Sequence, residues 1–304
     1  MMQKNLRFES ANFITKLSIK DKKIFVCVGD ISERAFKKLN KKNFLNIGIM
    51  EQTMISFTAG LSKVGFIPFV HTITPFLIER CLEQIKLDFG YQKLSGNLIS
   101  TGSAFDYSKL GASHHCYSDF KILSSIPKIR LFFPSSQNEI EVLIKKNYKN
   151  GLNYFRIPEY GHQYVIKKEK IKTGRPIKIK SGKDLTCIAI GAQLRNALII
   201  SEKIKDTYSI EILYIHSINP MQMDLIKKSI LKTKKVFLLD EQSEISLAAE
   251  KIYKLRMSLN FEFLNINIKN DDFIREYGDK KDLERFIGLE PDLVIKKIKK
   301  IFKK

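Results

Sequence analysis

Apolar and polar residues follow two alternating patterns along the chain, and together they predict an α/β protein. Short apolar runs of strand length are followed by stretches in which apolar residues recur every three or four positions, as on one face of a helix. Strands are predicted at residues 23–29, 44–50, 67–72, 97–101, 129–134, 152–158, 185–190, 210–215, 236–240 and 261–266. Helices are predicted at residues 6–17, 33–38, 51–64, 75–91, 136–148, 193–204, 224–232, 245–259 and 291–302. Because strand and helix alternate in two series, we expect two domains, each a mostly parallel sheet flanked by helices.

A basic stretch from Val165 to Lys183 separates the two alternating series. It contains Gly174, Pro176 and Gly182, residue types that interrupt regular structure. We therefore predict a first domain over residues 1–165, a linker over residues 166–183 and a second domain over residues 184–304.

The composition limits the classes of protein to which the chain can belong. Hydrophobic residues make up 44% of its 304 positions, which favours a folded globular protein over a disordered one. No apolar run approaches the roughly 20 residues that a membrane-spanning helix needs. The first residues, MMQKNLRFESANF, lack the apolar core of a signal peptide. These features predict a cytoplasmic protein with no membrane partner.

The cysteine pattern argues against a metal site in this chain. Cys27, Cys81, Cys116 and Cys187 do not have the spacing of metal ligands. In the cytoplasm, such isolated cysteines are expected to be reduced.

The net charge of +21 permits nucleic acid, an anionic membrane or a phosphorylated substrate as a partner. However, the lysines are spread over the whole chain, and there is no zinc finger or RNA-binding aromatic signature. We therefore expect solvated lysine faces and no nucleic-acid partner. An acidic partner subunit is the second possibility. A basic, non-catalytic scaffold or nucleic-acid binder remains the alternative from another functional class.

One acidic residue stands at a junction between a strand and a helix. The apolar run from Phe44 to Met50 leads directly into Glu51, where the helical pattern begins. Burial at such a junction disfavours the charged form of a carboxyl group, as is common at catalytic sites. The structural alternative is a glutamate in the first turn that is stabilised by the helix dipole.

The sequence around this junction resembles the pyrimidine-binding domain of transketolases. The resemblance lies in NIGIMEQ, the following TAG and the segment GFIPFVHTITPF. It continues through PFLIERCLEQIKLDFGYQKL and LGASHHCYSDFKILSSIP, so it covers most of the first half of the chain. The second half is similar to the carboxyl-terminal domain of the same family, with weaker motifs. The resemblance implies a transferase that depends on thiamine diphosphate and moves a ketol or acyl group from a ketose or 2-oxo donor to an aldehyde.

The resemblance also implies which residues contact the cofactor. Glu51 matches the glutamate that bonds the aminopyrimidine ring and so helps to remove the proton from the thiazolium carbon. Phe76 matches the aromatic residue that packs on that ring. Ile73 and Glu79 stand where further aromatic residues often occur in the family, so we expect Ile73 to line the pocket with an aliphatic group. Arg80 is a further cofactor-binding candidate. Asp30 matches an aspartate that follows the first strand near the cofactor.

Two of these residues also have a structural interpretation. Asp30 fits the N-cap position of the helix predicted at residues 33–38. Phe76 is one of 21 phenylalanines and fits an ordinary core position.

The substrate-binding residues implied by the resemblance lie at strand ends and in the long loop at residues 102–115. His114 matches a family histidine that contacts the substrate near its reacting carbonyl group. His115, His71 and Arg156 are the other candidates. The arginine is expected to bind a phosphate or carboxylate through its planar fork.

Three features of the sequence bear on the substrate-binding residues. Arg156 could instead pair with Glu159 at the end of its strand. The adjacent His114 and His115 lack a suitably spaced third ligand, which argues against a metal site. Leu110 replaces an aspartate that reads a donor hydroxyl group in transketolases, so the use of sugar phosphates is in doubt.

The family motif that holds magnesium and the diphosphate, G-D-G…N, does not occur in this sequence. We therefore expect the chain to be the carboxyl-terminal subunit of a split enzyme. An N-terminal transketolase-like subunit would hold Mg²⁺, and thiamine diphosphate would bridge the two chains in an α2β2 heterotetramer. The rival interpretation is the β subunit of a 2-oxo acid dehydrogenase decarboxylase. The succession of YQKL and GASHH favours the transketolase side.

Overall fold

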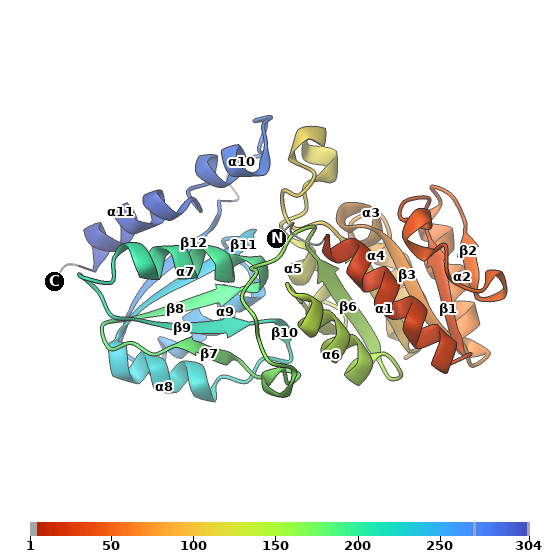
Figure 1. Cartoon of the computed structure of the whole chain (residues 1–304), viewed down its shortest axis with the longest axis horizontal. Coiled ribbons are helices and arrows are strands. Elements are labelled where there is room, and N and C mark those ends of the chain that lie inside the picture. The colour runs from red at the N-terminus through yellow and green to blue at the C-terminus, as the bar shows by residue number, and fades with distance from the viewer. Residues whose placement is uncertain (1–4, 270–271, 303–304) are drawn as a thin grey trace.

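The computed structural model describes residues 5–269 and 272–302, which form two α/β domains lying side by side (Figure 1). The strand order is β10-β5-β6-β4-β3-β1-β2 in the first sheet and β12-β11-β8-β9-β7 in the second. Most neighbouring strands are parallel, and helices pack on the sheets. The predicted fold class is confirmed.

The first sheet places the predicted site at the carboxyl ends of its parallel strands. Its strands are β1 (Ile24–Val28), β2 (Phe44–Asn46), β3 (Ile67–Ile73), β4 (Gly96–Thr101), β5 (Arg130–Phe132), β6 (Leu152–Ile157) and β10 (Ser217–Asn219). The α-helices of this domain are α1 (Leu6–Lys20), α2 (Glu51–Lys63), α3 (Thr74–Ile78), α4 (Leu82–Gln84), α5 (Asp119–Leu123) and α6 (Gln137–Asn147). Ser136 caps α6, as its Ser-x-x-Glu pattern predicts.

The second sheet begins earlier than the sequence indicated. Its strands are β7 (Ile177–Lys180), β8 (Leu185–Ile190), β9 (Ile210–Ile215), β11 (Lys235–Ser243) and β12 (Glu262–Ile268). Its helices are α7 (Leu194–Lys203), α8 (Asp224–Thr233), α9 (Leu247–Leu255), α10 (Lys280–Phe286) and α11 (Pro291–Ile301). The predicted linker at 166–183 therefore contains β7, an edge strand that runs antiparallel to β9. Because its buried and exposed residues alternate, its hydrophobic signal was weak.

Two predicted helices are wrong in detail. The helix expected at 75–91 is divided into α3, α4 and a π-helical segment at Ile85–Tyr91, and the interruption falls between Ile78 and Leu82. The segment at 33–38 forms only a 3-10 helix at Glu33–Phe36. Its N-cap is Ser32, so the capping interpretation of Asp30 is also wrong.

The two domains are joined by more than the chain connection. Strand β10, which follows β9 in sequence, pairs antiparallel with β5 of the first sheet. One apolar cluster contains residues of both domains, such as Phe155 and Leu239. Among the residues that the structure describes, no helix is long and apolar enough to cross a membrane.

Candidate active site

Glu51 occupies the first position of α2 and is buried, with 2% of its surface exposed. The strand before it ends at Asn46, earlier than predicted, but the predicted start of the helix is confirmed. A Cβ atom placed on Gly29 would lie 3.3 Å from Glu51 Cγ. The end of β1 therefore passes directly beside this carboxyl group, as expected where parallel strands end at one edge of a sheet.

Arg80 connects Glu51 to the predicted ring-stacking residue. Its Nη1 lies 2.6 Å from Glu51 Oε2, and its guanidinium carbon lies 4.3 Å from the centre of the Phe76 ring. Arg80 is therefore the cationic partner of Glu51, and nothing in the sequence indicated this pair.

His114 completes a row of four contacting side chains. Its ring meets Phe76 edge to face, with centroids 5.0 Å apart and ring planes at 71°. Its Nδ1 lies 3.0 Å from Ser113 Oγ. Partial burial lowers the pKa of His114, which favours the neutral imidazole. The structure thus brings together four side chains from different elements: Glu51 of α2, Phe76 of α3, Arg80 between α3 and α4, and His114 of the long loop.

Asp30 and Ile73 lie at the same edge of the first sheet. Asp30 follows β1, is exposed and adopts a left-handed backbone conformation with φ of 66°. Its backbone N–H donates to Asn46 Oδ1 at 3.0 Å, which fixes the end of β1 against the end of β2. Ile73 ends β3 and is buried.

His71 does not face the candidate site. It is buried in β3, where its Nδ1 lies 2.9 Å from Ile99 O and its Nε2 lies 2.6 Å from Ser32 Oγ. Burial, with a contribution from the charge of Arg7, lowers its pKa to about 3. Both ring nitrogens of His71 are occupied by partners within the fold, so neither is free to bind a substrate in this structure.

Arg156 is also a structural residue in the described chain. Its side chain is fully buried, and its guanidinium lies 3.3 Å from Asp119 and 3.2 Å from Glu241. Burial acts to lower the pKa of Arg156, but the two carboxylates outweigh it and raise the pKa. Arg156 therefore pairs with Asp119 and Glu241 and not with Glu159, and the second domain supplies one of these partners.

His115 turns away from His114. It is buried against Phe105, with ring centroids 5.2 Å apart, and burial lowers its pKa. It lines a small cavity of about 300 Å³ together with Glu79 and Tyr117. Leu110, in the same loop, is 55% exposed.

Several residues that shape this region carried no signal in the sequence. Asp119 and Glu241 are the buried partners of Arg156, and Lys280 lies 2.6 Å from Asp106 in the long loop. A charged residue inside an apolar stretch is the only local clue to such pairs, and it does not identify the partner. Here each pair except Arg156–Asp119 joins the two domains.

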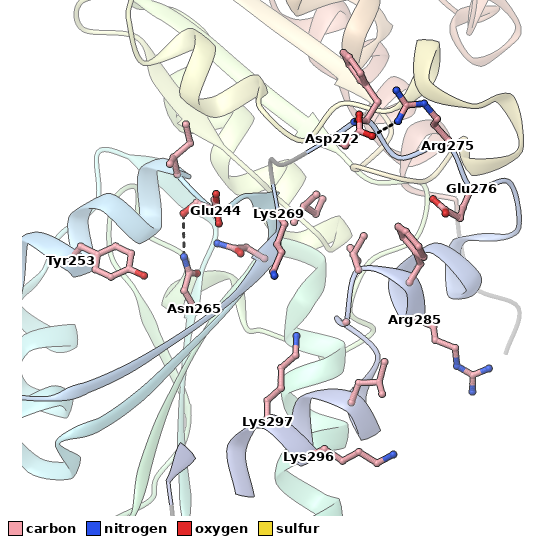
Figure 2. A pocket seen from close by; sticks show the side chains of 18 residues that line it. Glu244, Tyr253, Asn265, Lys269, Asp272, Arg275, Glu276, Arg285, Lys296 and Lys297 are labelled. Carbon is pink, nitrogen blue, oxygen red and sulfur yellow. Dashed lines mark hydrogen bonds and ion pairs between the residues drawn. The ribbon is translucent and has the colours of Figure 1, made fainter. Parts of the chain in front are cut away.

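A cavity of about 1150 Å³ lies in the second domain, apart from these residues. Figure 2 shows Lys269 and Lys297 directed into it, and an ion pair between Asp272 and Arg275 at one side. None of the predicted site residues lines it.

The described residues fit one half of a thiamine diphosphate site. A buried carboxylate beside a half-buried aromatic ring suits an aminopyrimidine, which offers a flat face and polar edge groups. Within residues 5–269 and 272–302, however, no group of three His, Cys, Asp or Glu side chains is placed to hold a metal ion. In the part of the chain that the structure describes, no side-chain cluster therefore fits the magnesium ion of such a site.

Comparison with known proteins identifies the family. Residues 4–160 match the family described as "Transketolase, pyrimidine binding domain". Residues 174–294 match the family described as "Transketolase, C-terminal domain". The chain therefore belongs to the transketolase family, whose members depend on thiamine diphosphate. Its two domains, in this order, make it a transketolase-like enzyme subunit of the carboxyl-terminal type, in the transferase class.

Relatives and a solved structure agree with this assignment. A putative transketolase C-terminal section from Methanocaldococcus jannaschii is 30% identical over 284 residues, which are 91% of this chain and 88% of that protein. One of the subunits of an apulose-4-phosphate transketolase from Phocaeicola vulgatus is 24% identical, with 91% and 89% covered. The structure of a split-gene transketolase, described as an inactive beta4 tetramer, superposes with a TM-score of 0.87 at 25% identity and covers 98% of each chain.

Proposed function

We propose that this chain is the β-type subunit of a two-chain enzyme that transfers a ketol or acyl group from a ketose or 2-oxo donor to an aldehyde. The observation that carries the proposal is the buried Glu51 at the start of α2, in one row with Arg80, Phe76 and His114. When bound, thiamine diphosphate supplies a nucleophilic carbon and an electron sink, which protein side chains lack.

Glu51 would bind a polar edge group of the pyrimidine ring through its carboxyl group and relay the proton that the reaction needs. Phe76 and Ile73 provide the apolar surface that orients a flat ring and excludes water. Arg80 now covers one face of Phe76 and occupies Oε2. Its guanidinium therefore has to move before that face and that oxygen become available. Asp30, at the same edge of the first sheet, is a further residue that we assign to cofactor binding.

His114 is the group that meets the substrate. With Nδ1 held by Ser113, its Nε2 is the atom that donates a hydrogen bond to a substrate oxygen as that oxygen gains charge. The lowered pKa keeps the imidazole of His114 neutral near neutral pH, so its Nε2–H group is available as a hydrogen-bond donor. His115 adds a buried imidazole beside this position.

The partner is an N-terminal transketolase-like chain that holds Mg²⁺ and the diphosphate. Supporting this, exposed apolar residues flank the Glu51 helix at Ile49, Met50, Phe57 and Phe66. Phe25 contacts both Phe57 and Phe66, so these rings form a continuous surface that suits a partner. The solved relative is inactive as four β chains, which also agrees with a missing half-site. By analogy with the family, we propose an α2β2 heterotetramer in which the two kinds of chain share the cofactor.

The donor belongs to the ketoses or 2-oxo compounds. One relative is named for apulose 4-phosphate and another, from Clostridium, for 6-deoxy-6-sulfo-D-fructose, so related subunits act on different sugar derivatives. Leu110 cannot read a donor hydroxyl group through a hydrogen bond, which favours a donor that lacks the group read by an aspartate in transketolases.

The substitution Glu51→Gln in the complex assembled with the partner tests the proposal. Gln keeps the shape and the hydrogen bonds but cannot relay a proton. The rate of proton–deuterium exchange at the thiazolium carbon, and the turnover, should fall roughly 10² to 10⁴-fold. The matched control is Glu83→Gln, an exposed glutamate on α4, which should exchange at the parent rate. If Glu51→Gln exchanges as fast as the parent, Glu51 is only a helix-start residue and the proposal fails.

A further inference from the structure

The loop that carries His114 is packed against the second domain. Ala104 and Phe105 of this loop form a small apolar cluster with Ile268, Ile274 and Leu283. This cluster is separate from the two larger cores of the molecule. In Figure 1 the yellow segment that contains the loop lies beside α10.

Lys280, the first residue of α10, makes the main polar contact with the loop. Its Nζ lies 2.6 Å from Asp106 Oδ1 and 2.9 Å from Ser103 Oγ. The other oxygen of Asp106 accepts hydrogen bonds from the backbone N–H groups of Ser103 and Glu159, both at 2.7 Å. One buried carboxylate therefore ties together α10, the start of the loop and the residues after β6.

The charges of this contact are matched. Burial acts to lower the pKa of Lys280, but Asp106 and Glu241 outweigh it and raise the pKa. Burial acts to raise the pKa of Asp106, and Lys280 with two backbone N–H groups outweighs it and lowers the pKa. Both groups stay charged near neutral pH, so the contact is a charge-assisted hydrogen bond between a buried carboxylate and a partly exposed ammonium group.

A second contact holds the loop close to His114. Gly111 has a φ of +74°, and a Cβ atom added to it would lie 2.7 Å from the Tyr277 hydroxyl oxygen. Tyr277 therefore packs directly on the backbone of Gly111, whose carbonyl oxygen accepts the N–H of His114 at 2.9 Å. At the start of the loop, the N–H of Ala104 donates to Glu241 Oε1 at 3.2 Å.

We propose that residues 272–287 of the second domain act as a clamp that positions the loop at residues 102–115, with Lys280 as its positioning residue. Ordering a loop of this kind costs conformational entropy at every residue, so tertiary contacts have to hold it in one conformation. The clamp does not touch the reacting atoms. It fixes the place of His114, and this part of the inference rests on the proposed function.

The test compares Lys280→Met with Lys281→Met, which changes the next, exposed lysine of the same helix. Amide hydrogen exchange is measured on the chain alone, and turnover on the complex with its partner. Lys280→Met should speed exchange in the loop at least 10-fold and lower kcat roughly 10 to 100-fold, with a smaller change in KM, because a loss of alignment of about 1 Å costs this much. Lys281→Met should match the parent, and Lys280→Arg should recover most of kcat.

Two further measurements keep the inference falsifiable. Tyr277→Ala removes an exposed side chain outside the cores, so it should loosen the loop without unfolding the domain. If loop exchange is unchanged in both Lys280→Met and Tyr277→Ala, the clamp is refuted. If exchange rises but kcat stays at the parent value, Lys280 is structural only and the positioning role is refuted. If the assembled parent transfers no group, the proposed function fails and the positioning role fails with it, while the exchange data still decide whether the clamp exists.

Discussion

Replacing Arg156 by methionine should destabilise the protein strongly, because two buried carboxylates would lose their shared cation. Asp119 and Glu241 lie 3.3 Å and 3.2 Å from the guanidinium. Removing one partner of a buried ion pair costs about 3–5 kcal/mol, since the remaining charge is left without compensation.

The remaining hydrogen bonds place the expected loss at the lower end of this range. Asp119 still accepts from Tyr154 at 2.5 Å and from Gln242 at 2.8 Å. Glu241 still accepts from the backbone N–H of Ala104 at 3.2 Å. We therefore expect a loss of about 3 kcal/mol in the free energy of unfolding, a large part of the 5–15 kcal/mol that typically stabilises a protein.

Urea unfolding of the isolated chain, followed by circular dichroism, measures this loss. With a slope of about 2–3 kcal/mol per molar urea, a loss of 3 kcal/mol moves the midpoint down by about 1–1.5 M. The matched control is Arg275→Met, which removes an exposed arginine from its pair with Asp272 and should hardly move the midpoint. If Arg156→Met moves the midpoint no more than this control while raising KM, Arg156 binds substrate and the structural assignment is wrong.

Two other predictions concern the cofactor and pH. The isolated chain should bind thiamine diphosphate weakly and show no turnover, because no cluster of described side chains fits the magnesium ion that binds with the diphosphate. Calorimetry with cofactor and Mg²⁺ checks this, and tight stoichiometric binding would refute it. Burial raises the pKa of Asp240 to about 7, against about 3.9 in an unfolded chain. The folded state then binds more protons between these values, so Asp240 makes stability fall as pH rises from about 4 to 7. Asp240→Asn should flatten this fall in thermal unfolding; an unchanged profile would contradict the shift.

Local patterns in the sequence were enough to predict the fold class and the position of Glu51 at the start of a helix. Strand-length apolar runs and helical spacing indicated most elements, and the junction at Glu51 was visible because the apolar period changes there. The family resemblance singled out Phe76 and His114, which the structure brings into contact. These features depend on neighbours in the chain, so one sequence was enough to find them.

Charge pairing between distant segments was decided only by the tertiary structure. Arg156 and His71 looked like site residues because they lie on strands that lead toward the site, yet partners far away in the sequence hold both inside the fold. The contact of Lys280 with Asp106 joins residues 174 positions apart. Sequence spacing cannot reveal such pairs, because packing of the second domain on the first decides which polar groups remain exposed and which need a buried partner.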